Sequence, residues 1–114
     1  MQTIETAIQE AFSAARIATD KVIEDNPEQW YPCGFAWVRI LPASGPLAKY
    51  LKENGMADRA YNGGLTVYNP SKNHTQWMDA KEAGAIAFKN SLVTWLLENP
   101  QKVEYKVFVE SRMD

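Results

Sequence analysis

The chain has 114 residues, of which 46% are hydrophobic and 23% charged, a composition typical of one globular domain rather than of a disordered or collagen-like chain. No apolar run approaches the roughly 18 residues of a membrane span, and acids stand near the start where a secretory signal carries bases, so we expect one cytoplasmic domain. A net charge of −2 and a pI near 5.4 lack the basic excess of a strongly electrostatic nucleic-acid binder.

The first expected element is a helix over residues 1–26. Thr3 is a candidate N-cap, and Pro27 disfavours the helical conformation at Asn26, so the helix should end by Asp25 or Asn26. One apolar stripe recurs at helical spacing, formed by Ile4, Ala7, Ile8, Ala11, Ala15, Ala18 and Val22. This segment is also acidic: residues 1–30 hold six acids and two bases, against eight acids and ten bases in residues 31–114.

A strand is expected over residues 34–41. Its side chains alternate between two faces, with Ala36, Val38 and Ile40 on one and Phe35, Trp37 and Arg39 on the other. Neither face is wholly polar, which favours a position inside the sheet. A short helix over about residues 46–54 follows, because Pro46 suits a first helical position and Gly55 suits the left-handed residue after a helix.

A hairpin should come next, with one strand over residues 65–68 and a second short extended run over residues 74–77. A second long helix is predicted over about residues 79–98, with Asp79 and Glu82 as a capping box. Lys81 and Asn90 should lie on its polar face, and Gly84 indicates close packing at that turn. Alternating apolar residues predict a last strand over residues 103–109.

The predicted order is a helix followed by β-α-β-β-α-β. This is the connectivity of the ferredoxin-like split β-α-β fold, an α+β architecture, here with an extra N-terminal helix. The spatial strand order would be 4-1-3-2, with residues 34–41 in the middle of the sheet. We therefore expect one domain over residues 1–114, made of the helix 1–26 and a ferredoxin-like core over residues 30–114.

Several phrases of the sequence resemble a known group. The words "YPCGFAWV", "NGG" and "MDAKEAGAIAF", with the charged end "ESRMD", are similar to small uncharacterised proteins encoded by phages, notably marine ones. The resemblance covers about residues 30–114. It implies a phage or prophage origin and the host cytoplasm as location, and it brings no assigned activity and no functional residues.

Cys33 and His74 are the only cysteine and the only histidine. A cysteine nucleophile needs a basic partner, and these two residues could lie on adjacent strands. The pattern is weak, because a free cysteine is usually a small buried hydrophobe. We assign no catalytic residue, and with no ligand spacing to guide a metal site we expect no metal and no cofactor.

The strongest candidate site is the sheet face opposite the helices, formed by Phe35, Trp37, Arg39 and Tyr68. Aromatic rings beside arginine on an open sheet are the means by which RRM-like domains stack bases. The alternative is that the N-terminal helix or a second subunit covers this face, and the acidic balance of the chain favours the covered state. For Arg39 itself, an ion pair with Glu104 or Glu110 on the last strand is favoured over a ligand contact.

Three functions follow from these observations. The first hypothesis is a phage accessory protein that is not an enzyme, a protein-interaction module that acts through a protein partner or as a homodimer. The second is a single-stranded nucleic-acid binder that uses the aromatic face, which the acidic pI disfavours. The third is a small enzyme that uses Cys33 and His74.

Overall fold

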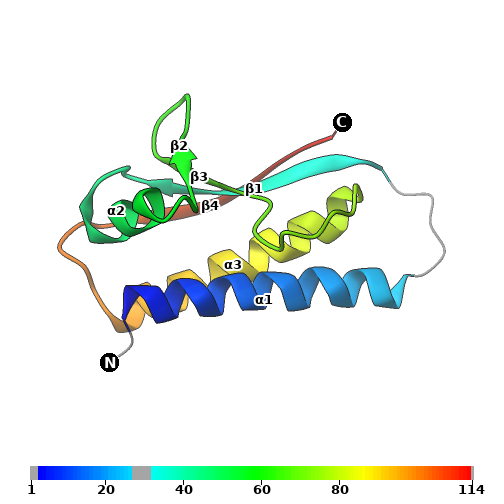
Figure 1. The fold of residues 1–114 in the computed structure, drawn as a ribbon, viewed down its shortest axis with the longest axis horizontal. Coiled ribbons are helices and arrows are strands. Elements are labelled where there is room, and N and C mark those ends of the chain that lie inside the picture. The colour runs from blue at the N-terminus through cyan, green and yellow to red at the C-terminus, as the bar shows by residue number, and fades with distance from the viewer. Residues whose placement is uncertain (1–2, 27–31, 114) are drawn as a thin grey trace.

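The computed structural model describes residues 3–26 and 32–113. Figure 1 shows a sheet at the top, α3 below it, and α1 below α3. The elements in chain order are α1 (Ile4–Asp25), β1 (Gly34–Leu41), α2 (Gly45–Glu53), β2 (Asp58–Arg59), β3 (Leu65–Tyr68), α3 (Met78–Glu98) and β4 (Lys106–Met113). Within the described residues, no helix combines the length and the apolar character needed to cross a membrane.

Helix α1 forms as predicted and packs along α3. The Thr3 side chain accepts a hydrogen bond from the Thr6 amide, 3.2 Å, and the helix ends at Asp25. Small residues line the face that meets α3, and the buried Thr19 hydroxyl donates to the Ala80 carbonyl, 2.7 Å. A Cβ atom at Gly84 would collide with the Thr19 hydroxyl, which confirms the predicted close packing at this glycine.

The four strands form one antiparallel sheet in the order β2-β3-β1-β4. Strand β1 is central, as its two-sided apolar character predicted. Ala36, Val38 and Ile40 are fully buried toward the helices, where they join one core with residues of all three helices. The fold is thus α+β, with three helices and four antiparallel strands.

The hairpin differs from the prediction. Residues 65–68 form β3, but the partner of β3 is β2 and not residues 74–77, which contribute only an isolated bridge between Cys33 and Trp77. The turn between β2 and β3 contains Gly63 and Gly64, both with positive φ (104° and 79°). The "NGG" phrase therefore closes the hairpin, and the strand before it is too short to show a pattern.

Two element boundaries also differ. The predicted capping box is wrong, because Trp77 is the N-cap of α3 and Asp79 lies in its first turn. Strand β4 starts at Lys106 rather than at residue 103 and continues to Met113. The physical reason is that Lys106 pairs with Leu41, the last residue of β1, so β1 offers no partner to residues 103–105. There the Tyr105 hydroxyl donates to the Ser44 carbonyl, 2.8 Å, at the start of α2.

Lys81 does not lie on an exposed polar face. It is only 9% exposed, and its Nζ donates to the Gly34 carbonyl, 3.0 Å. The Gly34 amide donates to the Gln76 carbonyl, 3.0 Å, so the backbone groups of Gly34 point to the β3 side of β1, beyond the end of β3. Strand β3 therefore supplies no donor to the Gly34 carbonyl. Lys81 supplies one instead, whereas Asn90 is exposed as predicted.

Candidate functional site

The four residues predicted as a binding face lie together. Phe35, Trp37 and Arg39 point away from the core, and Tyr68 of β3 lies directly opposite Trp37. Figure 1 shows α3 and α1 on the other side of the sheet. The alternative in which the N-terminal helix covers this face is therefore wrong, because the apolar stripe of α1 is buried against α3 instead.

Arg39 holds the loop between β2 and β3 at the edge of this face. Its Nε donates to the Gly63 carbonyl, 2.9 Å, and its Nη2 to the Asn62 carbonyl, 2.6 Å. Its Nη1 lies 3.7 Å from Glu110, which confirms the ion pair predicted with that residue. The side chain is only 16% exposed, so we assign Arg39 a structural role rather than direct contact with a ligand.

The same carboxylate fixes the central aromatic ring. Trp37 Nε1 donates to Glu110 Oε1, 2.9 Å, while Glu110 Oε2 faces Arg39. The two contacts satisfy the indole N–H and restrict the ring to one orientation. A ring that is already positioned loses little conformational entropy when a ligand stacks on it.

A groove of about 420 Å³ lies between the sheet and the β2–β3 loop, and this loop rises on the side away from α1 (Figure 1). Three predicted aromatic residues line the groove, and Arg39 does not. The lining residues are Phe35, Trp37, Arg59, Ala60, Tyr61, Asn62, Thr66, Tyr68, Glu110 and Arg112. The Phe35 ring lies 6.2 Å from the Tyr68 ring, and Arg112 lies 5.6 Å from the Phe35 centroid.

Sequence analysis missed Arg59, Tyr61 and Arg112 as members of this groove. Arg112 follows Phe108 and Glu110 at every second position. This two-residue period was the signal that the strand continues past its predicted end at residue 109. Arg59 and Tyr61 precede the two glycines of the hairpin turn. Only the pairing of β2 with β3 brings them to the sheet face.

We expect Arg39→Gln to loosen the β2–β3 loop. The substitution removes the guanidinium bonds to two loop carbonyls, and hydrogen bonds from a charged group contribute about 1.5–3 kcal/mol each. Backbone amides of residues 60–64 should therefore exchange with solvent about tenfold faster or more in hydrogen–deuterium exchange. Arg16→Gln, on the exposed surface of α1, is the matched control. Equal exchange in both variants would contradict the role of Arg39.

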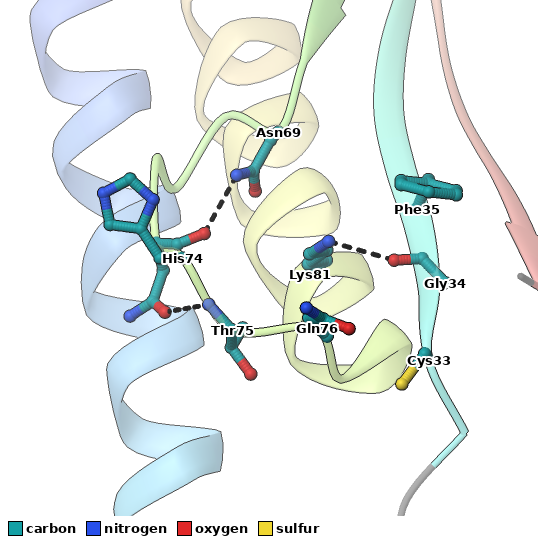
Figure 2. A pocket seen from close by; sticks show the side chains of 9 residues that line it. Cys33, Gly34, Phe35, Asn69, His74, Thr75, Gln76 and Lys81 are labelled. Carbon is teal, nitrogen blue, oxygen red and sulfur yellow. Dashed lines mark hydrogen bonds between the residues drawn. The ribbon is translucent and has the colours of Figure 1, made fainter.

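Cys33 and His74 line a different pocket, of about 340 Å³. Figure 2 shows them on opposite walls, with Lys81 between them bonded to Gly34. Cys33 is exposed rather than buried, and among the described residues it makes no hydrogen bond to a basic side chain. This geometry does not pair a thiol with a base. Nor does the described part of the chain bring together three or more His, Cys, Asp or Glu residues that could hold a metal ion.

Comparisons with protein-family models, with curated proteins and with solved structures give no match to this chain.

Proposed function

We propose that this protein binds single-stranded nucleic acid in the groove on its open sheet face. The observation that carries the proposal is the grouping of Phe35, Trp37 and Tyr68 beside Arg59 and Arg112 on a sheet face that no described helix covers. Unpaired bases stack on aromatic rings with about 1–3 kcal/mol per base, and arginines contact the phosphates. Tyr68 is 54% exposed, so its ring is accessible to a base.

Much of the negative charge of the chain lies far from the groove, on α1, so the net charge is a weaker argument against nucleic-acid binding than it was from sequence alone. That helix carries five acids and two bases, and it lies on the far side of α3 from the sheet (Figure 1). At the groove, two arginines face one carboxylate, Glu110, which is already engaged by Trp37 and Arg39. Because exposed charges are screened beyond about 8–10 Å, the local positive charge matters more for phosphate contact than the net charge of the chain.

The fold agrees with this proposal. Elements β1 to β4 follow a β-α-β-β-α-β order, and their antiparallel order in the sheet is the one expected for a ferredoxin-like core. We infer a ferredoxin-like fold with α1 added on the helical side. RRM domains use the open face of a four-stranded sheet for stacking. The phage origin is a separate proposal, which rests on the resemblance of the phrases.

The test is binding of labelled single-stranded oligonucleotides, DNA and RNA, measured by fluorescence anisotropy over a range of salt concentrations. We expect Tyr68→Ala to weaken binding about 5- to 140-fold, the equivalent of one lost stacking contact of about 1–3 kcal/mol. Tyr68→Phe keeps the ring and should bind as the wild type does. Affinity should also fall as salt rises, because phosphate contacts release counterions.

Ile17→Ala, an exposed apolar position on α1, is the control for a general loss of surface area and should leave binding unchanged. Duplex DNA of the same sequence should bind more weakly, since its bases are not free to stack on the rings. Wild-type affinity in Tyr68→Ala, or no binding of single strands at any salt concentration, would contradict the proposal.

The hypothesis of a protein-interaction module is supported at a different surface. Strand β4 is an edge strand, and no other described strand pairs with its outer side.

A further inference from the structure

The outer edge of β4 is long, and no described strand pairs with it. The strand has eight residues, lies last in the sheet, and contains neither proline nor glycine. Natural proteins usually blunt such an edge, because its unpaired backbone groups are a template for another strand. Lys106, Phe108, Ser111, Arg112 and Met113 are exposed, so no described part of the chain covers this edge.

The direction of the backbone groups follows from the pairing of β1. In antiparallel strands, both backbone groups of a residue point to the same side and successive residues alternate sides. The Ala36 carbonyl accepts from the Asn69 amide, 3.2 Å, toward β3. Arg39 therefore points its groups toward β4, where it pairs with Phe108. Every second residue of β4, starting with Val107, consequently presents its N–H and C=O at the free edge.

We propose that two copies of this chain pair through these edges, antiparallel, with the two-fold axis at Phe108. The charged side chains of the strand then fall opposite complementary charges. Lys106 lies opposite the partner's Glu110. Residues 103–105, which precede β4 in the single chain, would continue the strand in the pair, so that Glu104 lies opposite the partner's Arg112. The symmetry repeats both pairs. Opposite charges directly across two strands stabilise the pairing, whereas like charges destabilise it.

The charge pattern selects this register over its neighbours. Moving the axis by one residue to either side, or by two residues toward the C-terminus, puts like charges opposite each other. The conflicts are Glu104 with Glu110 for an axis at Val107, Lys106 with Arg112 for an axis at Val109, and Glu110 with its own copy for an axis at Glu110. An axis at Lys106 puts that lysine opposite its own copy. Among the axes from Lys106 to Glu110, only the axis at Phe108 brings no like charges together, and it pairs all four charged positions.

Apolar contacts agree with the same axis. Phe108 is 43% exposed in the single chain and lies opposite its own copy in the dimer. The backbone groups of this pair point away from the interface, and in such non-hydrogen-bonded pairs the side chains lie close together. Val107 lies opposite the partner's Val109, and the two residues exchange backbone hydrogen bonds. The exposed Met113 lies opposite the partner's Val103. A second copy of this chain thus satisfies the polar, charged and apolar groups of the edge together.

This dimer goes beyond nucleic-acid binding and does not depend on it. Its axis runs perpendicular to the sheet, so both open faces lie on the same side of one continuous sheet. The two grooves would then be adjacent and antiparallel. A dimer that fails to bind oligonucleotides would overturn the proposed function alone, and a monomer that binds them would overturn the dimer alone.

The first experiment is the solution mass, expected at twice the 12.9 kDa of the chain, followed by a cysteine scan in a Cys33→Ser background. Phe108→Cys should form an intermolecular disulfide under mild oxidation, because its Cβ atoms are about 4.5–5.5 Å apart across the axis. Lys106→Cys and Glu110→Cys are matched controls, each about two residues from the axis, and should crosslink at least tenfold more slowly. Fastest crosslinking at a control position would overturn the register. A monomeric mass without crosslinking would overturn the dimer.

A charge exchange tests the interface without any disulfide. Lys106→Glu and Glu110→Lys each place two like-charge pairs in their own homodimer and should weaken it about fivefold or more. Mixing the two variants restores opposite charges at every pair, so the mixture should form the heterodimer in preference to either homodimer. Circular dichroism of each variant shows whether it is folded. A mixture that stays as weakly associated as its components would overturn the proposed pairing.

Discussion

Phe88→Ala is expected to lower the free energy of unfolding by about 3–5 kcal/mol, the usual cost of removing a buried phenyl ring. Phe88 lies on α3 and is fully buried. Its ring meets Phe12 of α1 edge to face, with centroids 4.9 Å apart and an interplanar angle of 70°. The substitution removes this contact and leaves a cavity between the two helices. Urea unfolding followed by circular dichroism measures the change.

Asn90→Ala is the matched control for Phe88→Ala, because Asn90 lies on the same helix and is exposed. Surface substitutions of this kind usually change stability by no more than about 0.5 kcal/mol. Equal unfolding midpoints for the two variants would show that the α1–α3 interface does not form the core.

Ala11→Asp is expected to unfold most of the protein at neutral pH. Ala11 is fully buried on the face of α1 that packs on α3, so the introduced carboxylate would lose its water without gaining a partner. An isolated buried charge costs several kcal/mol, a large part of the roughly 5–15 kcal/mol by which domains are stable. Loss of the far-UV circular dichroism signal measures the result.

Ile17→Asp introduces the same charge on the exposed side of the same helix and should leave the protein folded. The pair also tests where α1 lies. If α1 covered the aromatic face of the sheet, Ala11→Asp would disturb Trp37 and leave the α3 core intact. A folded Ala11→Asp variant with altered tryptophan fluorescence would therefore contradict the fold described above.

Periodicity predicted the elements with long, regular patterns. The apolar stripe of α1 and the proline after Asn26 gave the extent of that helix. The alternation along residues 34–41 gave the central strand and separated the core side chains from Phe35, Trp37 and Arg39. That separation was sufficient to predict four residues of one face, because any residue opposite Trp37 in an antiparallel pair shares its side of the sheet.

The other features depend on contacts between distant segments. Strand β2 has two exposed residues and no apolar pattern, so only its pairing with β3 defines it. The apolar stripe of α1 shows that one face of this helix is buried, but it does not identify the element that covers it. The small residues near Gly84 allow α1 to pack closely on α3. Lys81 occupies a polar position in the helical pattern, yet it is buried because its Nζ donates to the Gly34 carbonyl. The positions of Arg59 and Arg112 also depend on distant segments, because strand pairing places both residues beside the groove.

The location of the acids in α1 also affects how a polyanion would meet this protein. Negative charge on the outermost helix and arginines at the opposite surface give the described residues an electric dipole moment that points from α1 toward the sheet. In the field of a polyanion this dipole turns the sheet toward the ligand before contact, which raises the association rate constant and leaves dissociation nearly unaffected. Salt near 0.15 M shortens the Debye length to about 8 Å, so the advantage operates only during the final approach.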